Sequence, residues 1–253
     1  MDLFKGGINM FKFNDIEDAV ADIRAGKIII VIDDEDRENE GDLVMAAEKV
    51  TGEAINFMAT YGKGLICTPM EEEILKELQI NSMVENNTDN HETAFTVSVD
   101  YKDTTTGISA YERALTISKL LENDVKPEDF RRPGHVFPLA ARKNGVLERT
   151  GHTEAAVDLA KLAGLKSAGV ICEVMKEDGH MARTEDLIKM AKEHNLKIIT
   201  VKSLLEYRKA NEKIIERVAE AKMPTRYGDF MMYGFVNKLN GEHHVALVKG
   251  QIN

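Results

Sequence analysis

The sequence contains only two cysteines, Cys67 and Cys172, and no tryptophan. Two cysteines exclude a disulfide framework and a cysteine-based zinc site, and such low cysteine usage is typical of a reducing cytoplasm. No apolar run approaches the roughly 18 residues that a membrane span needs, and the first residues lack the apolar core of a signal peptide. We therefore expect a cytoplasmic protein with no membrane partner.

Positive charge is also scarce. The chain has 33 Lys and Arg against 43 Asp and Glu, which gives a formal net charge of −10. This balance repels phosphate backbones, so we expect no nucleic-acid partner, although single arginines can still bind a small anionic substrate. Hydrophobic residues make up 43% of the 253 residues, enough for a substantial core. The length allows one large domain, or one domain plus a fragment.

Helical and extended patterns alternate along most of the chain. Apolar runs over residues 27–32, 169–175 and 197–201 predict buried strands. Two prolines and a glycine predict that residues 131–138 are irregular. Helix starts are predicted at Asn14-Asp15, Thr51, Ser109, Thr153 and Thr184. We infer an α/β (α+β) fold, a layered α/β/α sandwich with a mixed sheet, over about residues 9–208.

The alternation stops after residue 208. Residues 209–222 are charged and lack turn residues, which predicts a helical linker. Residues 223–253 contain a short, incomplete β segment, and about thirty residues cannot bury a core alone. We expect this tail to pack on the first domain, to pack on a partner, or to remain poorly ordered.

A dense acidic segment, residues 33–42, follows the predicted strand 27–32 and contains one arginine, Arg37. Crowded carboxylates repel one another unless a cation lies between them, and open α/β sheets bind ligands at the carboxyl ends of strands. An EF-hand loop that began at Asp36 would have Ala47 at its twelfth position, where a bidentate glutamate belongs. A strand rather than a helix also precedes the segment, so an EF-hand is excluded. Magnesium needs only one or two carboxylates, so we predict a divalent-metal and substrate loop. Glu38, Glu40 and Asp42 share one side if its backbone is extended.

Two further candidates stand outside this loop. Residues 149–153, Arg-Thr-Gly-His-Thr, precede a predicted helix, whose N-terminus can hold a phosphate while His152 can ligate a metal. The alternative is an ordinary cap at Thr153 beside a surface histidine. Glu173 lies in an apolar run, where a carboxylate is costly but useful for proton transfer. Its alternative is a strand-end glutamate that reaches solvent. His135 and Cys67 carry no such signal by themselves.

Together these segments resemble 3,4-dihydroxy-2-butanone 4-phosphate synthase, an enzyme family of riboflavin biosynthesis. The resemblance runs from about residue 12 to residue 208 and rests on the segments 33–42, 84–88, 105–110, 132–138 and 151–155, and on Asp178-Gly179 with Met181-Ala182-Arg183. It implies a lyase that uses Mg²⁺ or Mn²⁺, two per site, to convert ribulose 5-phosphate into 3,4-dihydroxy-2-butanone 4-phosphate and formate. It also implies a homodimer with the site near the subunit interface.

The resemblance also implies roles for single residues. It places Glu38 and His152 on the metal, and it places at the substrate Arg37, Asp42, Arg149 and Thr153. It gives His135 and Glu173 to catalysis, with Cys67 and Thr106 lining the site. The helix start adds Thr150 and Gly151 to the substrate-binding set, in which we also count Glu38, His152 and Glu173. The reaction needs proton transfer next to a ketone, which adds Asp33 and Glu40 to the catalytic candidates. Which group takes the first proton is left open.

The tail has a resemblance of its own. Residues 217–221, 223–228 and 244–250 are similar to the opening of GTP cyclohydrolase II, which is often fused behind the synthase. That family builds a zinc site from three cysteines further along, and no cysteine follows Cys172. We therefore expect a fragment of a bifunctional protein without cyclohydrolase activity.

Two other function classes share parts of these patterns. A phosphosugar isomerase-like enzyme would use the same enediol chemistry and metal but release no formate. A non-catalytic metal-binding module would bind the cation and turn nothing over. Formate release separates the synthase from both.

Overall fold

The computed structural model describes residues 3–4 and 11–250, so residues 9–10 and 251–253 of the predicted domains lie outside the described part. The chain divides into two compact units between Leu205 and Glu206. The helices and strands up to this division are, in order, β1 (Leu3–Phe4), β2 (Phe11–Lys12), α1 (Ile16–Arg24), β3 (Ile29–Ile32), β4 (Gly41–Ala46), η1 (Ala47–Lys49), α2 (Gly52–Phe57), η2 (Met58–Gly62), β5 (Cys67–Glu71), α3 (Glu72–Glu77), β6 (Val99–Tyr101), α4 (Ala110–Leu120), η3 (Pro127–Asp129), β7 (Phe130–Ala141), η4 (Gly145–Leu147), α5 (His152–Leu162), β8 (Gly169–Glu173), α6 (Thr184–His194), β9 (Ile198–Thr200) and α7 (Val201–Asn211), which crosses it.

A seven-stranded mixed sheet organises the first unit. Its order is β6-β7-β5-β8-β4-β3-β9. The pairs β3–β9 and β5–β7 are parallel, and the other four neighbouring pairs are antiparallel. The predicted mixed sheet is confirmed.

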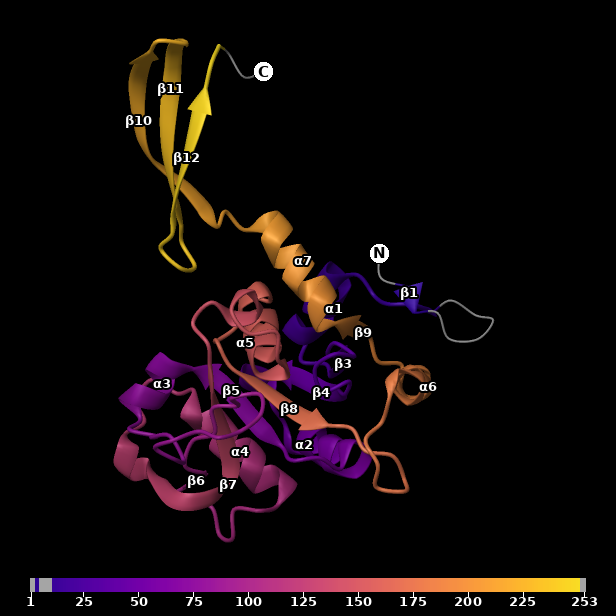
Figure 1. Ribbon diagram of the computed structural model, residues 1–253. Coiled ribbons are helices and arrows are strands. Elements are labelled where there is room, and N and C mark those ends of the chain that lie inside the picture. Colours follow the sequence, from indigo (N-terminus) through magenta and orange to yellow (C-terminus); the bar gives the residue numbers. More distant parts are fainter. Residues whose placement is uncertain (1–2, 5–10, 251–253) are drawn as a thin grey trace. The chain divides into compact units, whose positions relative to one another are not determined.

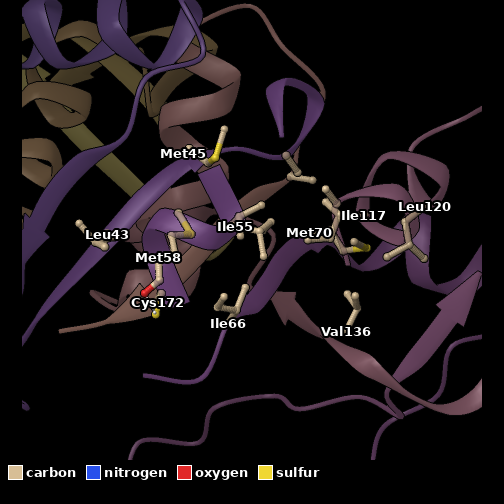
Figure 2. Packing of buried hydrophobic residues seen from close by; sticks show 14 of the residues in the cluster. Leu43, Met45, Ile55, Met58, Ile66, Met70, Ile117, Leu120, Val136 and Cys172 are labelled. Atoms are coloured by element: carbon tan, nitrogen blue, oxygen red, sulfur yellow. Dashed lines mark hydrogen bonds between the residues drawn. The ribbon is translucent and has the colours of Figure 1, made fainter. Parts of the chain in front are cut away.

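Helices cover both faces of this sheet. Side chains alternate along a strand, and Leu43 and Met45 of β4 share one hydrophobic cluster with Met58 of η2 and Ile117 of α4 (Figure 2). The opposite face lies against α5, where a Cβ added at Gly169 of β8 would come within 2.7 Å of the Ala156 side chain. Each large apolar side chain buried here contributes roughly 1.5–3 kcal/mol. The layered α/β/α prediction is therefore confirmed.

Among the predicted helix caps, Asp15, Thr51 and Ser109 are confirmed as N-caps. Thr153 and Thr184 are wrong as caps, since α6 begins at Thr184 itself with Arg183 as its N-cap. Thr51 accepts a hydrogen bond from the Ala54 N–H at 3.1 Å, and Ser109 accepts one from the Glu112 N–H at 3.2 Å. Helix α5, however, begins at His152 with Gly151 as its N-cap, so Thr153 is not the cap. A side chain at Gly151 would collide with Arg149, since an added Cβ would lie 2.3 Å from its Nη1.

The prediction that residues 131–138 are irregular is wrong, because β7 runs through them. Arg131 pairs with Asp100 of β6, whereas Val136 pairs with the neighbouring Val99, so residues 132–135 form a bulge. A bulge tolerates proline because its residues leave the hydrogen-bonded ladder. Pro133, in the bulge, therefore shapes this strand without ending it, and Pro138 stays within β7 opposite Thr68 of β5.

The second unit contains a three-stranded antiparallel sheet in the order β10 (Ile215–Thr225), β11 (Gly228–Asn237), β12 (His243–Val248). The predicted β segment is confirmed, but the helical linker over residues 209–222 is wrong. Helix α7 ends at Asn211, and β10 pairs with β11 along almost its whole length. Pairing with a neighbouring strand overrides local helix preference here.

In the part of the chain that the structure describes, no helix combines the length and the apolar character that crossing a membrane requires.

Candidate functional site

The acidic loop between β3 and β4 is folded around one carboxylate, that of Asp33. Asp33 is 5% exposed and accepts hydrogen bonds from the Glu38 N–H at 3.1 Å and the Glu40 N–H at 2.8 Å. The Arg37 guanidinium donates to the same carboxylate at 2.8 Å. Because three donors surround Asp33, its main effect is to shape the loop.

Arg37 also joins Glu38 to this arrangement. Its Nη1 lies 2.6 Å from Glu38 Oε2, and its side chain is mostly buried. The nearby His152 imidazole, and then Arg37, lower the pKa of Glu38 to about 2. Ligand atoms of Asp33, Glu38 and His152 all lie within 4.8 Å of one another. The predicted metal ligands Glu38 and His152 are thus brought together.

The orientation of the His152 ring follows from its buried hydrogen bond. Its Nε2 lies 3.1 Å from the Val31 carbonyl oxygen, which can only accept, so Nε2 carries a proton. Nδ1 lies 3.8 Å from Glu38 Oε2 and 3.7 Å from Asp42 Oδ1. Burial lowers the pKa of His152, but the charges of Asp42 and Glu38 outweigh it and raise the pKa to about 9. A histidine held through one nitrogen with the other among carboxylates has the usual geometry of a metal ligand.

Asp42 supplies a buried oxygen with unused bonding capacity. It is 2% exposed, and its Oδ1 has no hydrogen-bond partner among the described residues. Burial raises the pKa of Asp42 to about 7, and Glu173, which pairs with it on β8, adds to the rise. An orphaned buried carboxylate oxygen is costly and indicates a missing cation or proton.

Glu173 ends β8 and is half-buried. This agrees with the alternative interpretation of a strand-end glutamate that reaches solvent. Its Oε2 accepts a hydrogen bond from the Leu65 N–H at 2.8 Å. An added Cβ at Gly64 would come within 2.5 Å of this oxygen, so the glycine makes room for the carboxylate. Cys67, on the neighbouring strand, is buried, and burial followed by the charge of Glu173 raises the pKa of its thiol. The thiol is therefore neutral.

Arg183 is a residue of this site that the sequence reasoning missed. From the N-cap of α6 it donates to the carbonyl oxygens of Glu38, at 3.1 Å, and of Asn39. It thereby ties the acidic loop to the segment after β8. Burial and the charge of Glu38 raise the pKa of the neighbouring Glu40, which Arg183 partly opposes. The motif Met181-Ala182-Arg183 was the only signal in the sequence.

At the start of α5, Arg149 is held by three partners. It donates to the His91 carbonyl at 3.0 Å, to Thr93 Oγ1 at 3.0 Å and to Glu154 Oε2 at 2.6 Å. Glu154 is 1% exposed and was not predicted, although it follows the Gly-His-Thr motif directly. Thr153 is buried in the first helical turn, whereas Thr150 is exposed before it.

The remaining candidates, His135 and Thr106, belong to a second group of segments, which meet where an added Cβ at Gly107 would come within 2.2 Å of Asp100 Oδ2. Asp100 Oδ2 lies 2.8 Å from His135 Nδ1, and the Thr106 hydroxyl lies 3.4 Å from Glu112 Oε2. No hydrogen bond or ion pair between described residues links this group to the acidic loop. Asp100 was also missed, since a single acidic residue in an alternating strand carries no signal.

Fold and site together define a layered α/β protein with a carboxylate–imidazole cluster at the ends of its central strands. The family model for 3,4-dihydroxy-2-butanone 4-phosphate synthase matches residues 17–207, and that for GTP cyclohydrolase II matches residues 216–253. Because the first match covers well over half of the chain, the chain belongs to the 3,4-dihydroxy-2-butanone 4-phosphate synthase family. The resemblance of residues 12–208, and that of the tail, are confirmed.

Curated relatives carry the same two regions. Riboflavin biosynthesis protein RibBA of Aquifex aeolicus is 59% identical over 244 residues, and RibBA of Bacillus subtilis is 55% identical over 240 residues. Each alignment covers 95% of this chain and 60% of the relative, so the chain spans less than two thirds of these proteins.

Solved structures agree with this assignment. RibBX of A. baumannii, a two-domain 3,4-dihydroxy-2-butanone 4-phosphate synthase, gives a TM-score of 0.85 at 49% identity, over 94% of this chain and 70% of that chain. A synthase of the same name in complex with two magnesium ions gives 0.75 at 40% identity, over 79% and 98% of the two chains.

Proposed function

We propose that this chain is a lyase that converts D-ribulose 5-phosphate into 3,4-dihydroxy-2-butanone 4-phosphate and formate. The observation that carries the proposal is the cluster of Glu38, His152 and Asp42, built on the scaffold of the synthase family. We place the enzyme in the cytoplasm.

The cluster fits a hard divalent cation. Glu38 and His152 offer an oxygen and a nitrogen close together. Asp42 Oδ1, which has no hydrogen-bond partner among the described residues, lies 3.7 Å from Nδ1 of the His152 ring. Such a mixed set suits Mg²⁺ or Mn²⁺. We propose that Glu38 and His152 hold the cation, with two cations per site; a relative was solved in complex with two magnesium ions. When bound, the cation supplies Lewis acidity to the substrate oxygens.

Proton transfer falls to the carboxylates that surround this cluster. Asp42, with a pKa of about 7, can hold or release a proton near neutral pH. Glu40 and Glu173 lie half-buried beside it and are the further candidates. Asp33 acts by shaping the loop, and Arg37 holds Glu38 while keeping donors for an anionic substrate. Cys67 lines the site as a neutral thiol.

Substrate phosphate would be held at the start of α5. The first turn of a helix presents free N–H groups and a partial positive charge. Thr150, Gly151 and Thr153 lie at this end, and Arg149 is fixed beside it. We also propose a homodimer with the site near the subunit interface, where His135 and Thr106 join the reaction.

The test is carbon-13 NMR of the purified chain with labelled ribulose 5-phosphate and Mg²⁺, with and without EDTA. Formate that arises from C4 of the sugar and disappears with EDTA is the expected result. An isomer without formate would favour an isomerase, and no turnover by folded, cation-binding protein would favour a binding module. Light scattering of the same sample measures the expected dimer.

A further inference from the structure

The bulge in β7 holds a histidine and an aspartate in direct contact. Asp100 Oδ2 lies 2.8 Å from His135 Nδ1, and Asp100 Oδ1 accepts the His135 main-chain N–H at 2.9 Å. The Asp100 side chain is 7% exposed, whereas that of His135 is 44% exposed. One buried carboxylate thus holds both the backbone and the ring of an accessible imidazole.

The bulge explains why the carboxylate is needed. Residues 132–135 have left the β6–β7 ladder, so their N–H groups need other acceptors. Ser98 Oγ accepts the Gly134 N–H at 3.1 Å, and Asp100 accepts that of His135. On another side of Asp100 lies Gly107, where an added Cβ would come within 2.2 Å of Oδ2. The carboxylate has little freedom to move.

We propose that Asp100 is a positioning residue that keeps neutral His135 in the tautomer with its proton on Nδ1. A carboxylate can only accept hydrogen bonds, so the ring nitrogen that faces it must donate. Nε2 of this half-exposed ring then presents a lone pair, ready to accept a proton or a hydrogen bond from a substrate hydroxyl. The catalytic consequence rests on the proposed lyase function, but the tautomer does not.

Replacing Asp100 by asparagine should reverse the tautomer. The amide has one acceptor and one donor group. Its oxygen is required by the His135 main-chain N–H, so its NH₂ faces Nδ1. Nδ1 must then accept, and the proton moves to Nε2. The Asp100→Asn side chain has the same shape, so the change is one of proton position.

The experiment is nitrogen-15 NMR of histidine-labelled protein at alkaline pH, where the neutral ring can be assigned to one tautomer. The unmodified chain should show the Nδ1–H form for His135, and Asp100→Asn should show the Nε2–H form. With labelled ribulose 5-phosphate, Asp100→Asn should lower kcat at least about 100-fold with KM little changed. The matched control is Asp103→Asn, at an exposed position of the same segment, which should change neither.

Each outcome decides a separate point. An Nε2–H tautomer in the unmodified chain overturns the proposal without any variant. A reversed tautomer with unchanged kcat overturns the role of Asp100 in catalysis and leaves the lyase assignment intact. In contrast, the unmodified chain could show the Nδ1–H form and yet release no formate. That result would contradict the proposed function and leave intact the proposal that Asp100 sets the tautomer of His135. The double variant should lower kcat no further than His135→Ala alone, because Asp100 acts through His135.

Discussion

The seven-stranded and the three-stranded sheets of this chain differ in how their strands are covered. Every residue of β3 and β4 in the first unit is buried, whereas none of the residues of β10, β11 and β12 is buried. The acidic loop and its carboxylates lie between the two fully buried strands. Charged groups can be held close together only where a rigid, packed framework opposes their repulsion. The comparison therefore predicts that chemistry and stability both reside in the first unit.

The largest expected effect is from Glu38→Gln. It removes the charge that faces His152 and Arg37 while keeping the shape of the side chain. Cation affinity, measured by calorimetry, should fall at least about 100-fold, and formate release should be lost. Glu216→Gln in β10 is the matched control, since its exposed partner is Lys238, and it should change neither. Near-normal turnover by Glu38→Gln would refute its role.

The next largest difference between the two sheets is expected from a substitution in the core. Leu43 of β4 is fully buried, so Leu43→Ala should lower the free energy of unfolding of the first unit by about 2–5 kcal/mol. Phe235→Ala in β11, where the side chain is half-exposed, should leave the free energy of unfolding of the first unit unchanged. Urea denaturation followed by circular dichroism measures both. Equal effects from the two variants would contradict the comparison.

A smaller effect concerns the loop that carries Thr106. The Glu112 carboxylate accepts the Gly107 N–H at 3.1 Å and further bonds from Thr105, which lead the causes that lower its pKa to about 2. A lowered carboxyl pKa means that the stabilisation is complete above the ordinary value near 4.5 and is lost as the pH falls toward 2. The Gly107 amide signal should therefore shift only in acid, and Glu112→Gln should abolish this titration. A shift centred near pH 4.5 would argue against these hydrogen bonds.

The smallest effect is expected from removing the second sheet. A chain that ends at Lys213 retains α7 and the Arg208–Glu212 ion pair. Its formate release and the unfolding midpoint of the first unit should stay unchanged within error, because the predicted site residues all precede this point. A loss of activity together with a change from dimer to monomer would show that the second sheet supports assembly.

Local patterns predicted most of the fold. The β-branched run at β3 and the Thr51 and Ser109 caps are local signals, and they were confirmed. Residues 209–222 were misjudged because their helix preference is local, while the pairing of β10 with β11 is not. The prolines of β7 misled in the same way, since the bulge that holds Pro133 and the pairing of Pro138 with β5 both depend on partner strands.

The site was predictable where acidic residues crowd together and invisible where one residue supports another. Residues 33–42 stand out in any reading of the chain. Asp100, Glu154 and Arg183 act through residues up to about 145 positions away in the sequence. Nothing in a single sequence links such partners. Supporting contacts therefore require the structure, even when the family is recognised.

The hydrogen bonds around Asp33 have a consequence for how a cation arrives. They fix the acidic loop by donors that belong to the protein alone, namely two main-chain N–H groups and Arg37. Folding does not have to wait for the ion, unlike in proteins whose metal creates their structure. The loop holds its carboxylates close together although they repel one another, and a cation that binds between them lowers this repulsion. Ions should thus bind to and leave the folded protein, and a chelator should abolish formate release without unfolding the chain.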